Sequence, residues 1–214
     1  MIISHKHKFI FFAVPKTATH TIRQALRSHL GENDWEQQVL FGKQSIPIPE
    51  IAAIVHGHIS CRQLQPALDQ SSWNEYLKFA FVRNPYDRFV STCAFLNREN
   101  GNYAGNEMQF MKQALRRERF RQRILAIPQS ELLIGESGEL AVDYVGRFEE
   151  LQSCYDEVCS RISIPTEKLE SKNRSEHKTY TSYYDVELQQ AVAEFYQSDF
   201  KLFGYNPDMN THID

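Results

Sequence analysis

The sequence has 214 residues, of which 42% are hydrophobic and 24% charged, and its formal net charge is −3. These values are those of an ordinary globular chain that is long enough for one α/β domain with a sizeable core. The slightly acidic balance gives no sign of nucleic-acid binding, so any site for an anion has to be built locally.

The cysteines and the apolar runs indicate the cellular compartment and whether a metal is expected. Cys61, Cys93, Cys154 and Cys159 show no CxxC spacing, so neither a zinc site nor a redox pair is indicated. The start of the chain, MIISHKHK, is polar, and no run approaches the about 20 apolar residues of a membrane span. We expect reduced thiols, no bound metal, no transmembrane segment and a cytoplasmic protein.

Strand and helix patterns alternate along the chain. Aromatic and β-branched residues predict buried strands at residues 8–14 (KFIFFAV), 51–58 (IAAIVHGH), 76–82 (YLKFAFV) and 141–148 (AVDYVGRF). Helical spacing predicts helices at residues 19–30, from Pro85 or Tyr86 onward, and at residues 106–126, 151–162 and 186–196. This order predicts the α/β class, with a single domain over residues 1–214 and a three-layer sandwich around a mostly parallel central sheet.

Polar clusters follow three of the predicted strands, at residues 16–21, 56–60 and 83–91. In open α/β sheets, ligands bind beyond the carboxyl ends of the strands. These clusters are therefore the candidate functional residues.

The first cluster, in VPKTATHTI, lies between a strand and a helix. Backbone N–H groups at a helix start lack intrahelical partners and attract anions, and Lys16 adds a positive charge. The hydroxyls of Thr17, Thr19 and Thr21 can donate further hydrogen bonds. The stretch is not a Walker A loop, because it has no glycines before the lysine. Taken alone, an anion site and a simple capped helix start are equally good interpretations.

The second cluster, FVRNPYDRFVS, favours the anion site. Arg83 at a strand end and Ser91 early in the next helix can converge on one anion. The alternative is that Arg83 and Arg88 pair with Asp87 or Glu149 on a solvated face. We favour that alternative for Arg88 but not for Arg83.

Together, the two clusters resemble the cofactor-binding motifs of sulfotransferases that use 3′-phosphoadenosine 5′-phosphosulfate (PAPS). Four further stretches extend the resemblance over nearly the whole chain: HGHIS at residues 56–60, YVGRFEEL at 144–151, NRSEHKTYTSYY at 173–184 and FYQSDFKLFGY at 195–205. Their order is similar to the carbohydrate-type branch, which includes heparan sulfate 2-O-sulfotransferases and small bacterial members. The resemblance implies a P-loop-NTPase-like fold and sulfation of a hydroxyl on a carbohydrate or carbohydrate-bearing acceptor, with PAP as the second product.

The resemblance also implies roles for individual residues. It assigns the 5′-phosphosulfate to a loop made of Lys16, Thr17, Ala18, Thr19, His20 and Thr21. It assigns the 3′-phosphate to Arg83 and Ser91, and it makes His58 the catalytic base, with His56 as the second candidate. Ala18 replaces the glycine of the commoner loop, and His20 stands where a small hydroxyl residue is usual, so the role of His20 is open.

Three tyrosines fall in a region that the resemblance places near cofactor and acceptor: Tyr180, Tyr183 and Tyr184. We include Tyr180 among the cofactor-binding candidates, and aromatic packing inside the domain is an equal alternative for all three.

Sulfuryl transfer suits these side chains. Negative charge grows on the leaving oxygen as its bond to sulfur breaks, and Lys16 can stabilise that charge without a metal. A histidine, with an unperturbed pKa of about 6.5, can take the proton of an acceptor hydroxyl. Two histidines bonded to carbonyls at a strand end are the alternative for HGH.

Five arginines crowd RRERFRQR at residues 116–123, and helical spacing puts Arg116, Arg119 and Arg123 on one face. A solvated surface is the default interpretation, and a site for an acidic acceptor or an anionic membrane is the second.

Besides sulfuryl transfer, two other functions of the protein stay open, a phosphotransferase using magnesium and ATP and a non-catalytic PAP-binding module. The acceptor and the oligomeric state cannot be predicted from the sequence.

Overall fold

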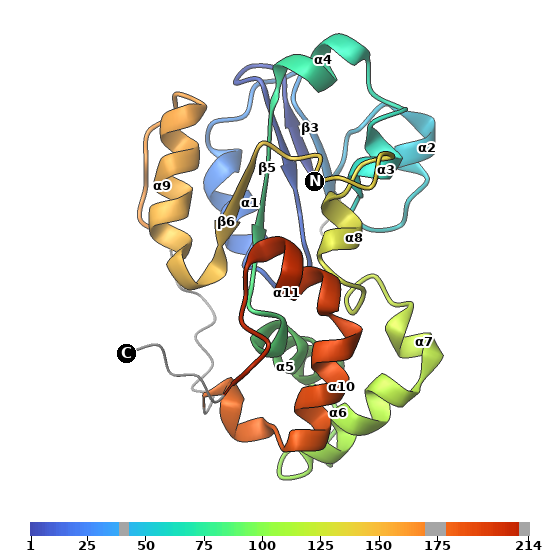
Figure 1. Cartoon of the computed structure of the whole chain (residues 1–214). Coiled ribbons are helices and arrows are strands. Elements are labelled where there is room, and N and C mark those ends of the chain that lie inside the picture. The colour runs from blue at the N-terminus through green and yellow to red at the C-terminus, as the bar shows by residue number, and fades with distance from the viewer. Residues whose placement is uncertain (39–42, 170–178, 210–214) are drawn as a thin grey trace. The chain divides into compact units, whose positions relative to one another are not determined.

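The structure is a computed structural model that describes residues 1–38, 43–169 and 179–209, with backbone alone for Lys43 and Gln44. The chain forms two compact units (Figure 1). Unit 1 consists of Met1–Val82 and Gln129–Lys172, and unit 2 of Arg83–Pro128 and Asn173–Asp214. The first part of the stretch NRSEHKTYTSYY, residues 173–178, lies outside the described residues.

Unit 1 is built on a six-stranded sheet in the order β4-β3-β1-β2-β5-β6. The strands are β1 (Ile2–Ser4), β2 (Phe9–Phe12), β3 (Trp35–Gln38), β4 (Lys43–Gln44), β5 (Leu77–Val82) and β6 (Tyr144–Arg147). Pairs β2–β5 and β5–β6 are parallel, whereas β1–β2, β1–β3 and β3–β4 are antiparallel. The sheet is mixed, so the expectation of a mostly parallel sheet is not confirmed. The turn between β1 and β2 is too short for a parallel crossover.

The register of the parallel strands positions the first polar cluster. Phe11 of β2 pairs with Phe79 of β5, and Phe12 pairs with Ala80. Since both strands run in the same direction, their carboxyl ends lie at the same edge of the sheet. The loop that contains Lys16 leaves the sheet at that edge.

Helices cover both faces of this sheet (Figure 1). Phe9, Phe11, Phe79 and Phe81 alternate along β2 and β5, so they share one face with α1 (Thr19–Arg27) and α9 (Leu151–Arg161) in a single buried cluster. The other face is covered by short helices, which are α2 (Pro49–Ala52), α3 (Cys61–Leu64), α4 (Gln70–Glu75) and α8 (Ser130–Leu133). Unit 1 is thus an α/β sandwich.

The strand predicted at residues 51–58 is wrong. Pro49 instead starts the short helix α2, because its fixed φ suits the first position of a helix. Ile51 is buried, but Val55 is 80% exposed, which a buried strand would not allow. The histidines of HGH therefore lie on a turn.

Unit 2 is helical in its described part. It contains α5 (Pro85–Leu96), α6 (Glu107–Arg116), α7 (Glu118–Arg121), the 3₁₀ helix η3 (Tyr180–Tyr183), α10 (Val186–Phe195) and α11 (Gln197–Phe203). The side chain of Asn84 caps α5 by accepting a hydrogen bond from the backbone of Tyr86 at 3.0 Å. Phe89, fully buried, packs against Phe120 and Tyr196 with ring centroids 5.9 and 6.2 Å away.

The single long helix predicted at residues 106–126 is wrong, because the chain is extended at Arg117. Met111 and Leu115 are buried on one face of α6, and a continued helix would carry Phe120 away from that face. The break returns Phe120 to the core. It also means that Arg116, Arg119 and Arg123 do not share a helical face.

Candidate functional site

The loop after β2 is tightly wound. Lys16 and Ala18 both have left-handed backbone conformations, with φ of 66° and 62°. Thr17 between them is buried and donates its hydroxyl hydrogen to the carbonyl of Val14 at 2.9 Å. A non-glycine residue in this conformation costs about 1–2 kcal/mol. Such strain is typical of sites where the backbone is held for function.

The start of α1 has no side-chain cap. Its N-cap is Ala18, which has no side chain that can cap, and its first turn contains no acidic residue. The structure therefore does not support the alternative in which the threonines merely cap the helix. The N–H groups of Thr19, His20 and Thr21 belong to the first turn, where no intrahelical acceptor exists. Lys16, half-buried, lies two residues before the N-cap.

Replacing Ala18 by glycine should raise the free energy of unfolding by about 1 kcal/mol. Glycine adopts a φ of 62° without the Cβ penalty, and this relief exceeds the extra entropy of the unfolded chain. Urea unfolding measures the change. The matched control is Ala25→Gly in the last turn of α1, which should lower stability by up to about 1 kcal/mol. Equal signs for the two variants would contradict the left-handed loop.

His58 is tied to this loop. Its Nδ1 lies 2.6 Å from the carbonyl oxygen of Ala13, which can only accept, so Nδ1 carries the proton. In the neutral ring, Nε2 is then the basic nitrogen, and it has no hydrogen-bond partner among the described residues. Burial is the main reason why the pKa of His58 is lowered to about 3; the groups around it add to the lowering, and the Ala13 hydrogen bond opposes it. The ring of His58 is therefore neutral at physiological pH, with an unprotonated Nε2.

His56 has the opposite tautomer. Its Nδ1 accepts a hydrogen bond from the backbone N–H of His58 at 3.3 Å, so in the neutral ring the proton sits on Nε2. Burial also lowers the pKa of His56. The two rings lie 6.0 Å apart between centroids. Of the two predicted bases, only His58 presents a basic Nε2, which favours it over His56.

Gly57 allows the histidine turn to pack against β3. A Cβ at this position would lie 2.1 Å from the carbonyl oxygen of Gln37 and 2.7 Å from Nη2 of Arg23. Gly57→Ala should therefore lower the free energy of unfolding by about 2–3 kcal/mol. Gly101→Ala, whose Cβ would meet nothing within 4 Å, is the control and should change stability by less than about 0.5 kcal/mol. Urea midpoints for both variants test the close approach.

Arg83 and Ser91 belong to unit 2. Arg83 follows β5 directly, and its Nε donates to Asp87 at 2.7 Å within the first turn of α5. This is one of the ion pairs considered as an alternative to anion binding. Ser91 lies half-buried further along α5. Tyr180 of η3 is joined to the same region, since Asn84 donates to its hydroxyl at 3.5 Å.

Arg88 does not lie on a solvated face as predicted. It is buried, its guanidinium donates to the carbonyls of Leu125 and Ile127, and it stacks over the ring of Tyr196 at 5.3 Å. The carbonyls of a loop replace the predicted carboxylate partner. Arg88 therefore holds the interior of unit 2 together.

Tyr184 packs inside unit 2. Its hydroxyl donates to the carbonyl of Tyr86 at 2.8 Å, and the two rings meet edge to face at 5.1 Å. Burial raises the pKa of Tyr184 well above its usual value. For Tyr184, the packing alternative is confirmed.

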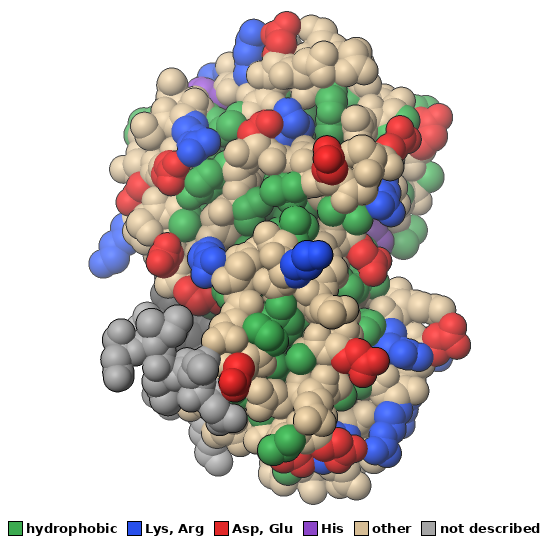
Figure 2. Space-filling view, in the orientation of Figure 1, with side chains coloured by type: hydrophobic (Ala, Val, Ile, Leu, Met, Phe, Trp, Pro, Cys, Tyr) green, Lys and Arg blue, Asp and Glu red, His purple; other side chains and the backbone are tan. Residues whose placement is uncertain are grey.

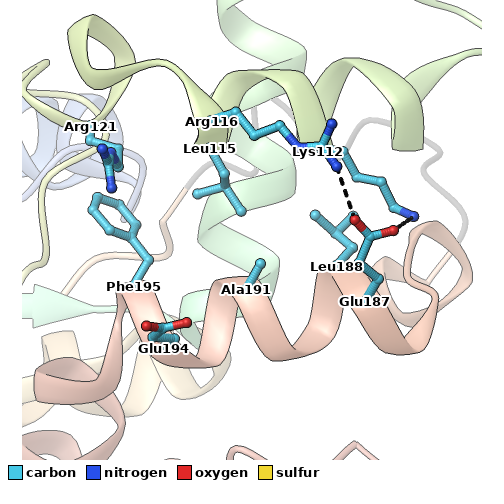
Figure 3. Close-up of a pocket in the computed structure, with 9 residues that line it drawn as sticks. All are labelled: Lys112, Leu115, Arg116, Arg121, Glu187, Leu188, Ala191, Glu194 and Phe195. Atoms are coloured by element: carbon cyan, nitrogen blue, oxygen red, sulfur yellow. Dashed lines mark hydrogen bonds and ion pairs between the residues drawn. The ribbon is translucent and has the colours of Figure 1, made fainter.

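Two arginines of the cluster, Arg116 and Arg121, line a groove between α6 and α10 of about 560 Å³ (Figure 3). Lys112 and Arg116 pair with Glu187 at 2.6 and 3.1 Å, while Arg121 points toward Phe195 (Figure 3). Basic and acidic side chains are interspersed on the face shown in Figure 2. Four arginines of the cluster are exposed and have no ion pair with any described residue, namely Arg117, Arg119, Arg121 and Arg123.

Sequence reasoning missed Arg23. It is 2% exposed and lies on the apolar side of α1 next to Ile22 and Leu26, and its Nη2 donates to the carbonyls of Gly57 at 2.9 Å and Gln37 at 3.1 Å. An arginine among the core positions of an amphipathic helix was the signal that could have found it.

All four cysteines are buried free thiols, and burial raises the pKa of Cys61 to about 12.

Within residues 1–38, 43–169 and 179–209, no helix is both long and apolar enough to cross a membrane, and no cluster of side chains has the composition of a metal site.

Comparison with known proteins identifies the family. Residues 1–206 match the model of the sulfotransferase family, a span that includes the Lys16 loop, the histidine turn and most of unit 2. Searches of curated proteins and of solved structures gave no significant match. The family match agrees with the resemblance of the two polar clusters, and the chain belongs to the sulfotransferase family.

Proposed function

We propose that this protein transfers the sulfuryl group of PAPS to a hydroxyl of a carbohydrate or carbohydrate-bearing acceptor, with His58 as the base and Lys16 stabilising the leaving oxygen. Family membership supports sulfuryl transfer in general. The observation that carries the residue assignment is the hydrogen bond from His58 Nδ1 to the carbonyl of Ala13, because it joins a proton acceptor to the anion-binding loop.

The loop after β2 suits the 5′ end of such a nucleotide, and we assign its other end to the motif that follows β5. The left-handed backbone at Lys16 and Ala18 and the uncapped start of α1 suit the 5′-phosphosulfate. We assign the 3′-phosphate to Arg83 and Ser91, and a supporting contact to Tyr180. The parallel pairing of β2 with β5 supports this division, since the two motifs follow strands that end at the same edge of the sheet.

The side chains divide the chemistry between them. When bound, PAPS supplies an activated sulfuryl group whose leaving group is a phosphate. The ammonium of Lys16 meets the negative charge that develops on the leaving oxygen, so its help is greatest in the transition state. Nε2 of His58 accepts the hydroxyl proton as the new oxygen–sulfur bond forms. The N–H groups of Thr19, His20 and Thr21 hold the anion in place while this occurs.

We further propose that the acceptor is acidic and that its charge is met by the arginines at residues 116–123. Four exposed arginines of this segment have no ion pair with a described residue, and one of them, Arg121, lines the groove together with Leu115 and Leu188. Arg119→Gln combined with Arg121→Gln should raise KM for an anionic polysaccharide several-fold and leave KM for its neutral analogue unchanged. If the double variant has the wild-type KM for both acceptors, the arginines are only solvated surface.

Isothermal titration calorimetry with PAP, compared with ATP plus magnesium, tests the donor. We expect tight binding of PAP that is lost in Arg83→Ala, and little binding of ATP. The control is Arg161→Ala, which removes an arginine with the same four-residue spacing to its carboxylate partner, Glu157. Tight magnesium-dependent binding of ATP would instead support a phosphotransferase.

A transfer assay with labelled PAPS and a panel of neutral and acidic saccharides tests the reaction. Labelled product from the wild-type protein, and none from Lys16→Ala or Arg83→Ala, is the expected result. PAP binding without transfer to any saccharide, and no effect of His58 substitution, would support a non-catalytic PAP-binding module.

A further inference from the structure

A buried arginine of α1 forms hydrogen bonds with the backbone of the histidine turn. Nη2 of Arg23 donates to the carbonyl of Gly57 at 2.9 Å and to that of Gln37 at 3.1 Å. Gly57 lies between His56 and His58, and Arg23 lies in α1, which begins at the anion-binding loop. A single guanidinium therefore connects the segment that carries the proposed base with the helix that receives the donor.

We propose that Arg23 is a positioning residue for His58, which it acts on by fixing the carbonyl of Gly57 and by placing a positive charge behind the histidine turn. This inference rests on the proposed function. Arg23 is 2% exposed, so its contact with Gly57 is shielded from water. The Cβ test at Gly57 shows how closely the two are packed, since any side chain there would meet Nη2 of Arg23 at 2.7 Å.

The charges around His58 act in one direction. The groups that face it are Arg23, the amino group of Met1 and His56, and all three lower the pKa of His58. The Met1 nitrogen donates to the same two carbonyls as Arg23, at 3.0 Å to Gln37 and 2.7 Å to Gly57. Burial lowers the pKa of Arg23 itself to about 10, so its guanidinium stays charged at neutral pH. Glu36 and Arg27 are its charged neighbours and have opposite effects on it.

Three substitutions separate the charge of Arg23 from its hydrogen bonds. Arg23→Lys keeps the charge, Arg23→Gln keeps N–H donors without charge, and Arg23→Met removes both. The matched control is Arg27→Met, one turn further along α1, where the arginine pairs with Glu36 and has no contact with the histidine turn. For each variant, calorimetry measures the affinity for PAP and thermal unfolding measures the stability.

Histidine NMR titration of the free protein and the pH profile of kcat/KM are the readouts that a merely structural role would not move. We expect the pKa of His58 to rise in Arg23→Gln and Arg23→Met and to stay in place in Arg23→Lys and Arg27→Met. We expect kcat to fall about 100-fold in Arg23→Met with PAP affinity nearly unchanged, and Arg23→Lys to recover much of that loss. Should Arg23→Met not fold, Arg23→Gln and Arg23→Lys still give the comparison.

Two results would overturn the inference while leaving the proposed function intact: an Arg23→Met enzyme no slower than Arg27→Met, or a His58 pKa that is the same in all four variants. Absence of transfer by the wild-type protein would instead reject the proposed function. The NMR titration requires no turnover, so the two failures can be told apart.

Discussion

Replacing Lys16 by methionine should lower kcat for sulfuryl transfer about 1,000-fold, the loss expected when one donor to a developing oxyanion is removed. Methionine has a similar length and fills the half-buried position, so the thermal midpoint should stay within about 2 °C of the wild-type value. The affinity for PAPS should fall less than kcat, because the charge that Lys16 meets is largest after the bond to sulfur begins to break. Steady-state kinetics and calorimetry measure the two effects.

Lys8 provides the control for this substitution. It is a lysine in the same unit with a left-handed backbone, at a φ of 51°, and it forms an exposed ion pair with Glu75 at 3.0 Å. Lys8→Met repeats both the side-chain change and the backbone conformation outside the loop after β2, and kcat should stay at the wild-type level. A Lys16→Met enzyme as active as Lys8→Met would remove Lys16 from the mechanism.

The parts of the fold that the sequence predicted are those with a strong local signal. The aromatic runs that became β2 and β5 and the helix start at Pro85 are each determined by residues within a few positions. The strand pairing was less accessible. The short β1, Ile2–Ser4, has too few residues for a periodic pattern, and its antiparallel pairing with β2 and β3 makes the sheet mixed.

The errors in the remaining elements arise from long-range packing. The apolar run at residues 51–58 has the composition of a strand, but Pro49 and the contacts of Gly57 with Gln37 and Arg23 turn it into a helix and a turn. The helix break at Arg117 depends on the burial of Phe120 against Phe89. No local pattern contains either contact.

In the candidate site, too, residues with a local sequence signal could be predicted and those that depend on distant contacts could not. The loop at Lys16 could be found because a helix start after a strand, rich in donors, is a local signal for an anion. The different hydrogen bonding of His56 and His58 could not be predicted, because it depends on a contact with Ala13, which is 45 residues away from His58. Arg23 was missed for the same reason, since its partners Gln37 and Gly57 lie on other segments.

His58→Gln should lower kcat about 1,000-fold, within the range for removal of a general base. Glutamine keeps an N–H donor for the carbonyl of Ala13 but offers no basic nitrogen, so the loop should keep its conformation. His56→Gln is the matched control, because its Nδ1 only accepts a backbone hydrogen bond, and we expect it to lower kcat less than about 10-fold. Steady-state kinetics decide between them, and a larger loss in His56→Gln would exchange the two roles.

The pH dependence offers a second test of His58. Its pKa of about 3 means that the ring stays neutral as pH falls from 7 to 5, so kcat/KM should be nearly constant over that range. A base with an ordinary histidine pKa would lose about 30-fold in kcat/KM at pH 5.

Stability should behave differently, because the unfolded chain binds a proton at His58 below about pH 6.5 and the folded protein does not. As the pH drops below about 6.5, the free energy of unfolding should therefore decrease, and His58 should contribute up to about 1.4 kcal/mol per pH unit to this decrease. His58→Gln should remove that contribution.

A pKa of about 3 also constrains when the proton moves. Such a weak base cannot remove the proton of a free alcohol, but the hydroxyl becomes strongly acidic once its oxygen begins to bond to sulfur. His58 is therefore expected to accept the proton late, as the oxygen–sulfur bond forms, and not before the attack. Acceptors with more acidic hydroxyls should then react no faster, since the proton is still in place when the attack begins and a more acidic hydroxyl is the weaker nucleophile. A steep rise of kcat with hydroxyl acidity across a series of saccharide analogues would show instead that the proton leaves first and that another group removes it.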